Sequence, residues 1–235
     1  MTYIELVNAV LRRLRESEVT TVQGAGNSNA YARLIGDFVN EAKSQVENAW
    51  KWSALRRTLT ATTVDGTFNY EIQGSQNNFQ VLSVLNDTSD IVMLYKDADW
   101  FNEAFLLTNP QRGIPTFYNF NGVSADGDTQ VDIYPIPDGV YTLRFNVVLR
   151  NVPLSGDSDP MEIPSRPVIL LATAMAIEER GEDGGQQSMN AYAAAQSALA
   201  DAVALDAGRH PEETVWYSVW NRLKHFLLLP PVSSV

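Results

Sequence analysis

Residues Pro164–Ala207 read PSRPVILLATAMAIEERGEDGGQQSMNAYAAAQSALADAVALDA, which predicts two helices joined by a glycine-rich elbow. Pro164 and Pro167 suit the first turn of a helix, where a missing backbone N–H breaks no hydrogen bond. The first helix should end near Gly181, because glycine readily takes the left-handed conformation that closes a helix C-terminus. The apolar residues before the elbow recur at helical spacing and would share one face. They are Val168, Leu171, Ala172, Met175 and Ala176.

The second half of this stretch is rich in alanine and predicts a helix that stops at Gly208. The distance between packed helices depends on the side chains at the contact, so alanine allows another backbone to approach closely. The residues expected along this helix are Met189, Tyr192, Ala193, Gln196, Leu199, Ala200, Val203 and Leu205 or Asp206. Two arrangements stay open at this point: a tight bundle within one subunit, or a bundle that also packs against copies of itself.

Two more helices are expected before residue 55. Thr2 and Glu5 have the spacing of a capping box, in which both side chains satisfy backbone N–H groups at a helix start. The apolar stripe of this first helix is Ile4, Val7, Val10, Leu11 and Leu14. A polar loop at 17–29 separates it from a second helix with the same kind of periodicity. The apolar positions of the second helix are Tyr31, Leu34, Ile35, Phe38, Val39, Ala42, Val46, Ala49 and Trp50.

Between residues 55 and 150 the apolar residues follow a period of two, which is typical of β-strands. Asp65-Gly66 predicts a hairpin turn between the first two strands. Asp97 would cap a short helix that extends to Leu107. Strands are expected at 59–63, 68–72, 79–85, 91–95, 116–120, 130–134 and 140–150. Because the pattern lacks the strand–helix–strand alternation of parallel sheets, we expect an antiparallel sandwich or barrel.

The predicted fold class is α+β. Residues 1–54 and 160–207 would form a discontinuous four-helix bundle, and residues 55–159 an antiparallel β sandwich or barrel-like module inserted into it. Residues 208–235 would form an extended arm, too short for a domain and too apolar for a solvated tail, so we expect it to dock on another surface. The partner-binding residues expected in this arm are Trp216, Tyr217, Trp220, Phe226, Leu227, Leu228 and Leu229.

The composition limits the classes of function. With 17 Lys and Arg against 28 Asp and Glu, the net charge is −11, which argues against tight sequence-independent DNA binding. The chain has no cysteine, which excludes disulfides, thiolate nucleophiles and cysteine-based zinc sites and fits assembly in a reducing cytoplasm. The sequence shows neither a signal peptide nor an apolar run long enough to span a membrane.

The acidic elbow is the best candidate for specific chemistry. Clustered carboxylates are typical ligands of divalent cations, but an arginine from a neighbouring subunit is the partner we favour. We therefore interpret the elbow as a subunit-contact loop and expect no metal. Its residues are Glu178, Glu179, Arg180, Glu182 and Asp183.

The other combinations of residues favour structural roles. Trp50 and Trp52 beside Arg56 and Arg57 have the residue types of a nucleic-acid platform, but helix and strand packing explains them better. Neither histidine belongs to a Ser/His/Asp pattern, and the sequence has no glycine-rich phosphate-binding loop. We therefore expect neither enzymatic activity nor a cofactor. The alternative class is a cell-wall hydrolase that uses a pair of carboxylates.

Several segments, taken in order, resemble the head-to-tail adaptors of short-tailed bacteriophages, the tail tubular protein A-like group. The resemblance covers about residues 1–217. Its segments are LVNAVLRRLRE at 6–16, LIGDFVNEAKSQVENAWKWSALR at 34–56, GDTQVDIYPIPDGVYTLRFN at 127–146, AIEERGEDGG at 176–185 and LDAGRHPEE at 205–213.

This resemblance implies a structural protein of the virion neck that is assembled in the host cytoplasm. It implies a homododecameric ring between the portal protein and the tail nozzle, with genomic DNA passing through the centre without specific binding. The helical bundle would form the ring wall, the β module would face the tail, and the arm would lie against the portal. Residues 217–235 depart from the family pattern because they are longer and more apolar than its members suggest.

Overall fold

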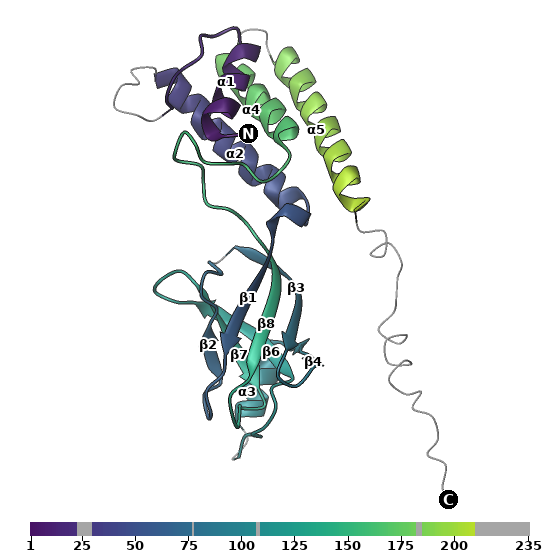
Figure 1. Cartoon of the computed structure of the whole chain (residues 1–235). Coiled ribbons are helices and arrows are strands. Elements are labelled where there is room, and N and C mark those ends of the chain that lie inside the picture. Colours follow the sequence, from purple (N-terminus) through teal and green to yellow (C-terminus); the bar gives the residue numbers. More distant parts are fainter. Residues whose placement is uncertain (23–29, 77, 107–108, 182–184, 210–235) are drawn as a thin grey trace, which may run out of the picture.

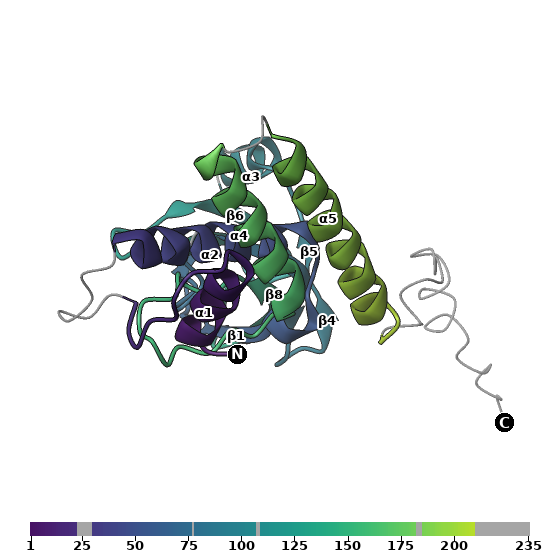
Figure 2. The same ribbon diagram turned by 90° about the horizontal axis from the view of Figure 1, so that it is seen from above.

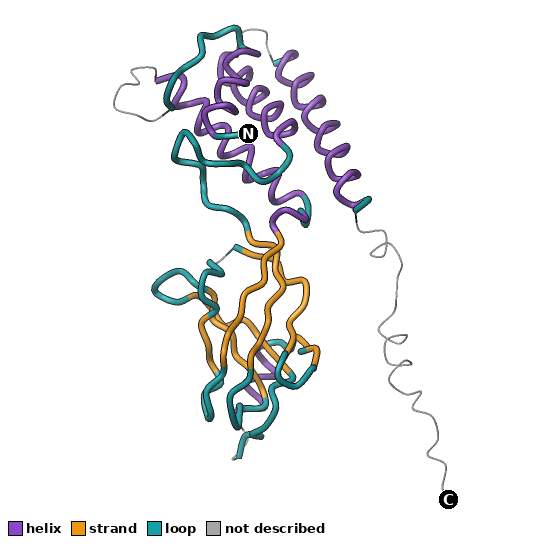
Figure 3. The backbone as a smooth tube through the Cα atoms, in the orientation of Figure 1, coloured by secondary structure: helices purple, strands orange, loops and turns teal. Residues whose placement is uncertain are grey.

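The computed structural model describes residues 1–22, 30–76, 78–106, 109–181 and 185–209. Four helices occupy one end of the molecule, and the strands together with the short helix α3 (Ala98–Leu106) occupy the other (Figure 1). The chain enters the β part after α2 (Ala30–Ala49) and returns to the helices after β8 (Thr142–Leu149), so helices from both ends of the sequence lie together (Figure 3). The α+β class is confirmed.

The helical hairpin predicted at 164–207 is present as α4 (Ser165–Arg180) and α5 (Gln186–Ala207). Gly181 ends α4 in the left-handed conformation with φ 64°, which a side chain would disfavour. The predicted face of α4 is buried along its whole length, and its members Val168, Ala172 and Ala176 are fully inaccessible. α4 is therefore the central helix of this part of the molecule.

The N-terminal helix α1 (Tyr3–Arg13) starts with the predicted capping box, in which the Thr2 backbone N–H donates to Glu5 Oε2 at 2.9 Å. α1, α2 and α4 share one apolar core. Gly36 allows α2 to approach α1, because a Cβ at this position would collide with the Tyr3 hydroxyl. These three helices form a compact bundle.

The predicted four-helix bundle is not confirmed, because α5 packs chiefly along α4 and does not complete a bundle with α1 and α2. Seen from above, α5 lies at the edge of the helical part (Figure 2). The physical reason is its narrow buried stripe, which has room for one neighbouring helix only. This stripe consists of Ser188, Ala195, Ala198, Ala202 and Asp206.

The β part consists of two four-stranded sheets with the strand orders β1-β8-β3-β4 and β2-β7-β6-β5. The remaining strands are β1 (Arg56–Thr62), β2 (Asn69–Glu71), β3 (Phe79–Asn86), β4 (Ile91–Val92), β5 (Leu94–Tyr95), β6 (Phe117–Val123) and β7 (Thr129–Tyr134). An apolar core fills the space between the sheets. The predicted alternation of β8 is confirmed, since Leu143, Phe145 and Val147 are fully buried there.

The hairpin predicted around Asp65-Gly66 is wrong. β1 pairs with β8 and β2 pairs with β7, so the two strands next to this turn belong to different sheets. The Gly66 N–H donates to the carbonyl of Pro137 instead of closing a two-residue hairpin. The turn residues were identified correctly, but their local pattern does not specify which strands pair.

Two further expectations about the sheets are also wrong. The strand predicted at 91–95 is divided at the buried Met93 between β4 and β5, which lie in different sheets. β5 then pairs with β6 in parallel, so the β part is mixed and not wholly antiparallel. The short helix α3 (Ala98–Leu106) connects this parallel pair, and Asp97 caps it through a 2.9 Å bond from the Trp100 N–H, as predicted.

Candidate subunit interface

The outward surface of α5 carries mostly small side chains and a single charged one, Asp201. The exposed residues on this surface are Met189, Ala193, Ala194, Gln196, Ser197, Ala200, Asp201, Ala204 and Leu205. Asp201 and Asp206 are the only charged residues of the helix, and Asp206 is buried. Solvent-facing helices usually carry many charged residues, so this surface differs from an ordinary exposed face.

The spacing of the small residues makes this surface a possible helix-packing face. Ala193, Ser197, Ala200 and Ala204 are three or four residues apart, which places them along one stripe on the side away from α4. Met189 and Leu205, two large apolar side chains, flank the stripe and are exposed. A second helix could approach this stripe as closely as α4 approaches the opposite side.

The elbow lies between α4 and α5. Two of its predicted contact residues, Glu178 and Arg180, form hydrogen bonds within the chain. Glu178 accepts a hydrogen bond from the Tyr192 hydroxyl at 2.6 Å, which ties the end of α4 to the first part of α5. Burial and this hydrogen bond raise the pKa of Tyr192 to about 12. Tyr192 therefore remains a hydrogen-bond donor throughout the physiological pH range.

Arg180 is engaged inside the subunit. Its Nη2 donates to Glu16 Oε1 at 2.6 Å, and its Nε donates to the Tyr31 hydroxyl at 2.8 Å. The guanidinium also lies 4.9 Å from the centre of the Tyr31 ring. Arg180 thus fastens the end of α4 to the segments that follow α1 and begin α2.

Glu179 is the remaining described acidic residue of the elbow, and its side chain is exposed. Glu182 and Asp183 lie outside the described residues. In the part of the chain that the structure describes, no group of three or more His, Asp or Glu side chains is arranged to hold a metal ion. None of the described helices has a segment long and apolar enough to cross a bilayer.

A comparison with known families gives a match over residues 1–220 to the SU10 adaptor protein. The chain belongs to the SU10 adaptor protein family. This confirms the resemblance to phage head-to-tail adaptors and identifies a structural role in a bacteriophage particle, at the virion neck. No curated protein matches the chain.

The residues predicted to bind the portal belong to the C-terminal arm. Trp216, Tyr217, Trp220, Phe226, Leu227, Leu228 and Leu229 all lie outside the described residues. The match to the family ends at residue 220, so it includes the first three of these aromatic residues and leaves 221–235 beyond it. Their role in partner binding stays a prediction.

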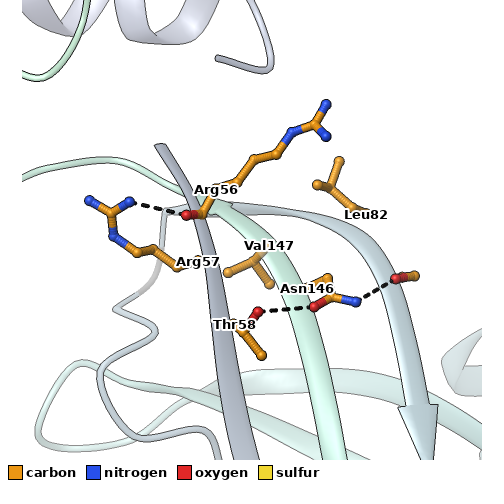
Figure 4. Close-up of a pocket in the computed structure, with 7 residues that line it drawn as sticks. Arg56, Arg57, Thr58, Leu82, Asn146 and Val147 are labelled. Atoms are coloured by element: carbon orange, nitrogen blue, oxygen red, sulfur yellow. Dashed lines mark hydrogen bonds between the residues drawn. The ribbon is translucent and has the colours of Figure 1, made fainter. Parts of the chain in front are cut away.

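The tryptophans and arginines near residue 50 do not form a nucleic-acid platform. Trp52 is 1% exposed and its Nε1 donates to the Val46 carbonyl, so its ring faces the core. Arg57 donates to Glu162 Oε2 at 2.6 Å. Arg56 and Arg57 border a polar hollow of about 550 Å³ on β1, where Asn146 links Thr58 to Ser83 (Figure 4). Among the residues that the structure describes, none with an aromatic ring lines this hollow.

Two polar groups near the junction of the helical and β parts have roles that the sequence did not indicate. Asp206 accepts hydrogen bonds from Trp50 Nε1, the Ser53 N–H and the Ser53 hydroxyl, at 3.1, 3.0 and 2.7 Å. Burial opposes ionisation of this carboxyl, but the hydrogen bonds outweigh it and lower the Asp206 pKa. The end of α5 is thereby fixed to the segment that leads into β1.

The second group is a buried ion pair on α2. Lys43 Nζ lies 3.0 Å from Glu47 Oε1, and the same ammonium donates to the carbonyls of Asn151 and Val152 at 2.9 and 3.1 Å. These carbonyls belong to the segment that returns from β8 to the helices. The helical periodicity could not reveal this pair, because Lys and Glu four residues apart are normally found on an exposed face.

Proposed function

We propose that this adaptor forms a homo-oligomeric ring between the portal and the tail nozzle, with DNA passing through its centre. We further propose a dodecamer in which α5 lies at the contact between copies. The observation that carries this proposal is the outward face of α5, which carries Asp201 as its single charge in a chain whose net charge is −11. A helix with one packed side and a second side of small residues is suited to contact with a neighbouring copy.

The contact would be heterologous, because a ring requires each copy to present two different surfaces. The α5 stripe supplies one of these surfaces. Its alanines leave little side-chain entropy to be lost when the contact forms. The acidic character of the chain also supports passage of DNA, since a negative channel wall repels phosphates and does not retain them.

Ala200→Glu tests the contact. Ala200 is exposed at the middle of the α5 stripe, so the variant should fold normally, but a carboxylate buried at the contact would lack a partner. We expect the fraction of portal complexes carrying a complete ring, counted by negative-stain electron microscopy, to fall about tenfold or more.

Thr60→Glu is the matched control, because Thr60 is also exposed but lies on β1. This variant should form rings as the wild type does. Normal ring formation by Ala200→Glu would show that α5 is not at the contact between copies.

Deletion of residues 216–235 tests the proposed role of the arm. We expect the truncated protein to keep the far-UV circular dichroism spectrum of the intact protein and to lose portal attachment in a co-sedimentation assay, because Trp and Tyr are the usual anchors of protein interfaces. Portal binding at the wild-type level by the truncated protein would rule out the arm as the docking element.

A further inference from the structure

The outer face of the β2-β7-β6-β5 sheet is divided into an apolar half and a polar half. Side chains alternate along a strand, so Phe117 and Asn119 of β6 point to the same face as Tyr134 and Asp132 of β7. α3 covers the apolar half, where Phe101 and Ala104 pack against Tyr134. The polar half next to it faces the same helix across a cavity.

A cavity of about 430 Å³ lies between α3 and this polar half. Its size is within the range of small-molecule sites. Aromatic rings form one side, and amide and carboxylate groups form the other. The aromatic side includes Phe68, Phe101 and Phe105, and the polar side includes Asn119, Asn121 and Asp132.

The polar side of the cavity is built around a buried carboxylate. Asp132 is 6% exposed, and its oxygens accept hydrogen bonds from Asn69 Nδ2 at 2.6 Å and from Asn121 Nδ2 at 2.9 Å. Within the described residues, no Lys, Arg or His forms an ion pair with it. Each oxygen still has a lone pair for a further donor. The carboxylate therefore favours ligands with O–H or N–H groups and repels anions.

Asn119 provides a second indication of a ligand. Its side chain is 5% exposed and borders the cavity, yet none of the hydrogen bonds in the described part of the chain uses its amide group. Its amide atoms are not fully buried, so a group that enters the cavity can reach them. Asn119 can both donate and accept, which suits a hydroxyl group.

We propose that this cavity binds a neutral hexopyranose unit. Sugar hydroxyls can donate to Asp132 and both donate to and accept from Asn119. The C–H face of a pyranose ring can lie against Phe68 and Phe105, whose ring centroids are 4.6 Å apart, because aromatic faces carry partial negative charge. α3 is at the end of the β part remote from the helices (Figure 1), so the site does not depend on the proposed α5 contact.

Saturation-transfer NMR on the full-length protein tests this proposal. The probes are the methyl glycosides of glucose, galactose and mannose, with glucuronate as the anionic comparison. We expect at least one neutral glycoside to bind with a millimolar Kd, and glucuronate to bind more weakly. A polysaccharide of the same sugar is then compared with the monomeric glycoside. Tighter binding of the polysaccharide would identify a polymer as the natural ligand, and equal affinity would identify the free sugar. Both results support the site.

Two variants locate the binding. Asn119→Ala should weaken it about fivefold, the effect of one lost hydrogen bond. Asn102→Ala, at an exposed cavity position on α3, should also weaken it and is not expected to affect folding. Asn146→Ala, which removes an amide from the other sheet, is the matched control and should bind normally. No binding of any neutral glycoside, preferential binding of glucuronate, or equal weakening by the control would overturn the proposal.

Discussion

Lys43→Met should destabilise the helical part by about 3–5 kcal/mol, the usual cost of leaving one member of a buried ion pair without its partner. Lys43 and Glu47 are each almost completely buried on α2. Without the ammonium, the Glu47 carboxylate stays in the core uncompensated, and the carbonyls of Asn151 and Val152 lose their donor. Urea unfolding followed by the helical circular dichroism signal measures this effect.

Lys51→Met is the matched control, since it removes the same charge from an exposed position near the end of α2. Its effect should be within about 0.5 kcal/mol of zero. Replacing both members, as Lys43→Met with Glu47→Leu, should restore most of the loss, because an apolar pair needs no compensation. If Lys43→Met is as stable as the Lys51→Met control, the Lys43–Glu47 ion pair does not hold α2 against the segment that returns from β8.

The pH dependence of Lys43→Met provides a separate check. Burial raises the pKa of Glu47, while Lys43 and Arg150 oppose this rise. Removing Lys43 should raise the Glu47 pKa further. For an acid with a raised folded-state pKa, the loss of stability is largest above that pKa and is relieved when the group is protonated in the folded state. The destabilisation should therefore decrease as the pH is lowered from neutral towards this pKa.

Trp52→Ala should cost about 3–5 kcal/mol, because it empties a core site next to η1 (Ser53–Leu55) and removes the bond to the Val46 carbonyl. Trp50→Ala should cost only about 1 kcal/mol. Trp50 is 37% exposed, and its Nε1 donates a hydrogen bond to Asp206. Urea unfolding of the two variants under the same conditions gives the comparison.

The two tryptophan variants also test a point at which the structure differs from the prediction made from the sequence. The sequence placed Trp50 on the apolar stripe of the second helix, whereas α2 ends at Ala49 and the buried ring is that of Trp52. Equal destabilisation by the two substitutions, or a larger effect of Trp50→Ala, would contradict the packing described here.

Much of the helical part was predictable because its signals are local. The capping box at Thr2, the left-handed Gly181 and the apolar face of α4 depend on residues within a few positions of one another. The face of α2 was predicted less well, since Lys43 and Glu47 are buried where the pattern suggested solvent. The carbonyls to which Lys43 donates lie more than a hundred residues further along the chain, and no local pattern records them.

The candidate interface was only partly predictable. The alanine-rich second helix was recognised, but both a closed four-helix bundle and a contact between copies agreed with the sequence. The structure shows that α5 packs chiefly on α4 and leaves a second small-residue face open. The cavity beside α3 was not predicted at all, because Phe68, Asn119 and Asp132 are separated in the sequence and meet only when the sheet forms.

The sequence by itself determined the order and the ends of most helices and strands and the α+β class, because periodicity, capping and turn residues act over a few positions. The relationship to phage adaptors came from the resemblance of whole segments. The tertiary structure alone decided which strands pair, that β5 and β6 run parallel, that α5 stays outside the three-helix bundle and that an ion pair is buried on α2. These features depend on contacts between residues that are far apart in the sequence. The free energy of such contacts depends on the whole folded arrangement, so no local pattern predicts them.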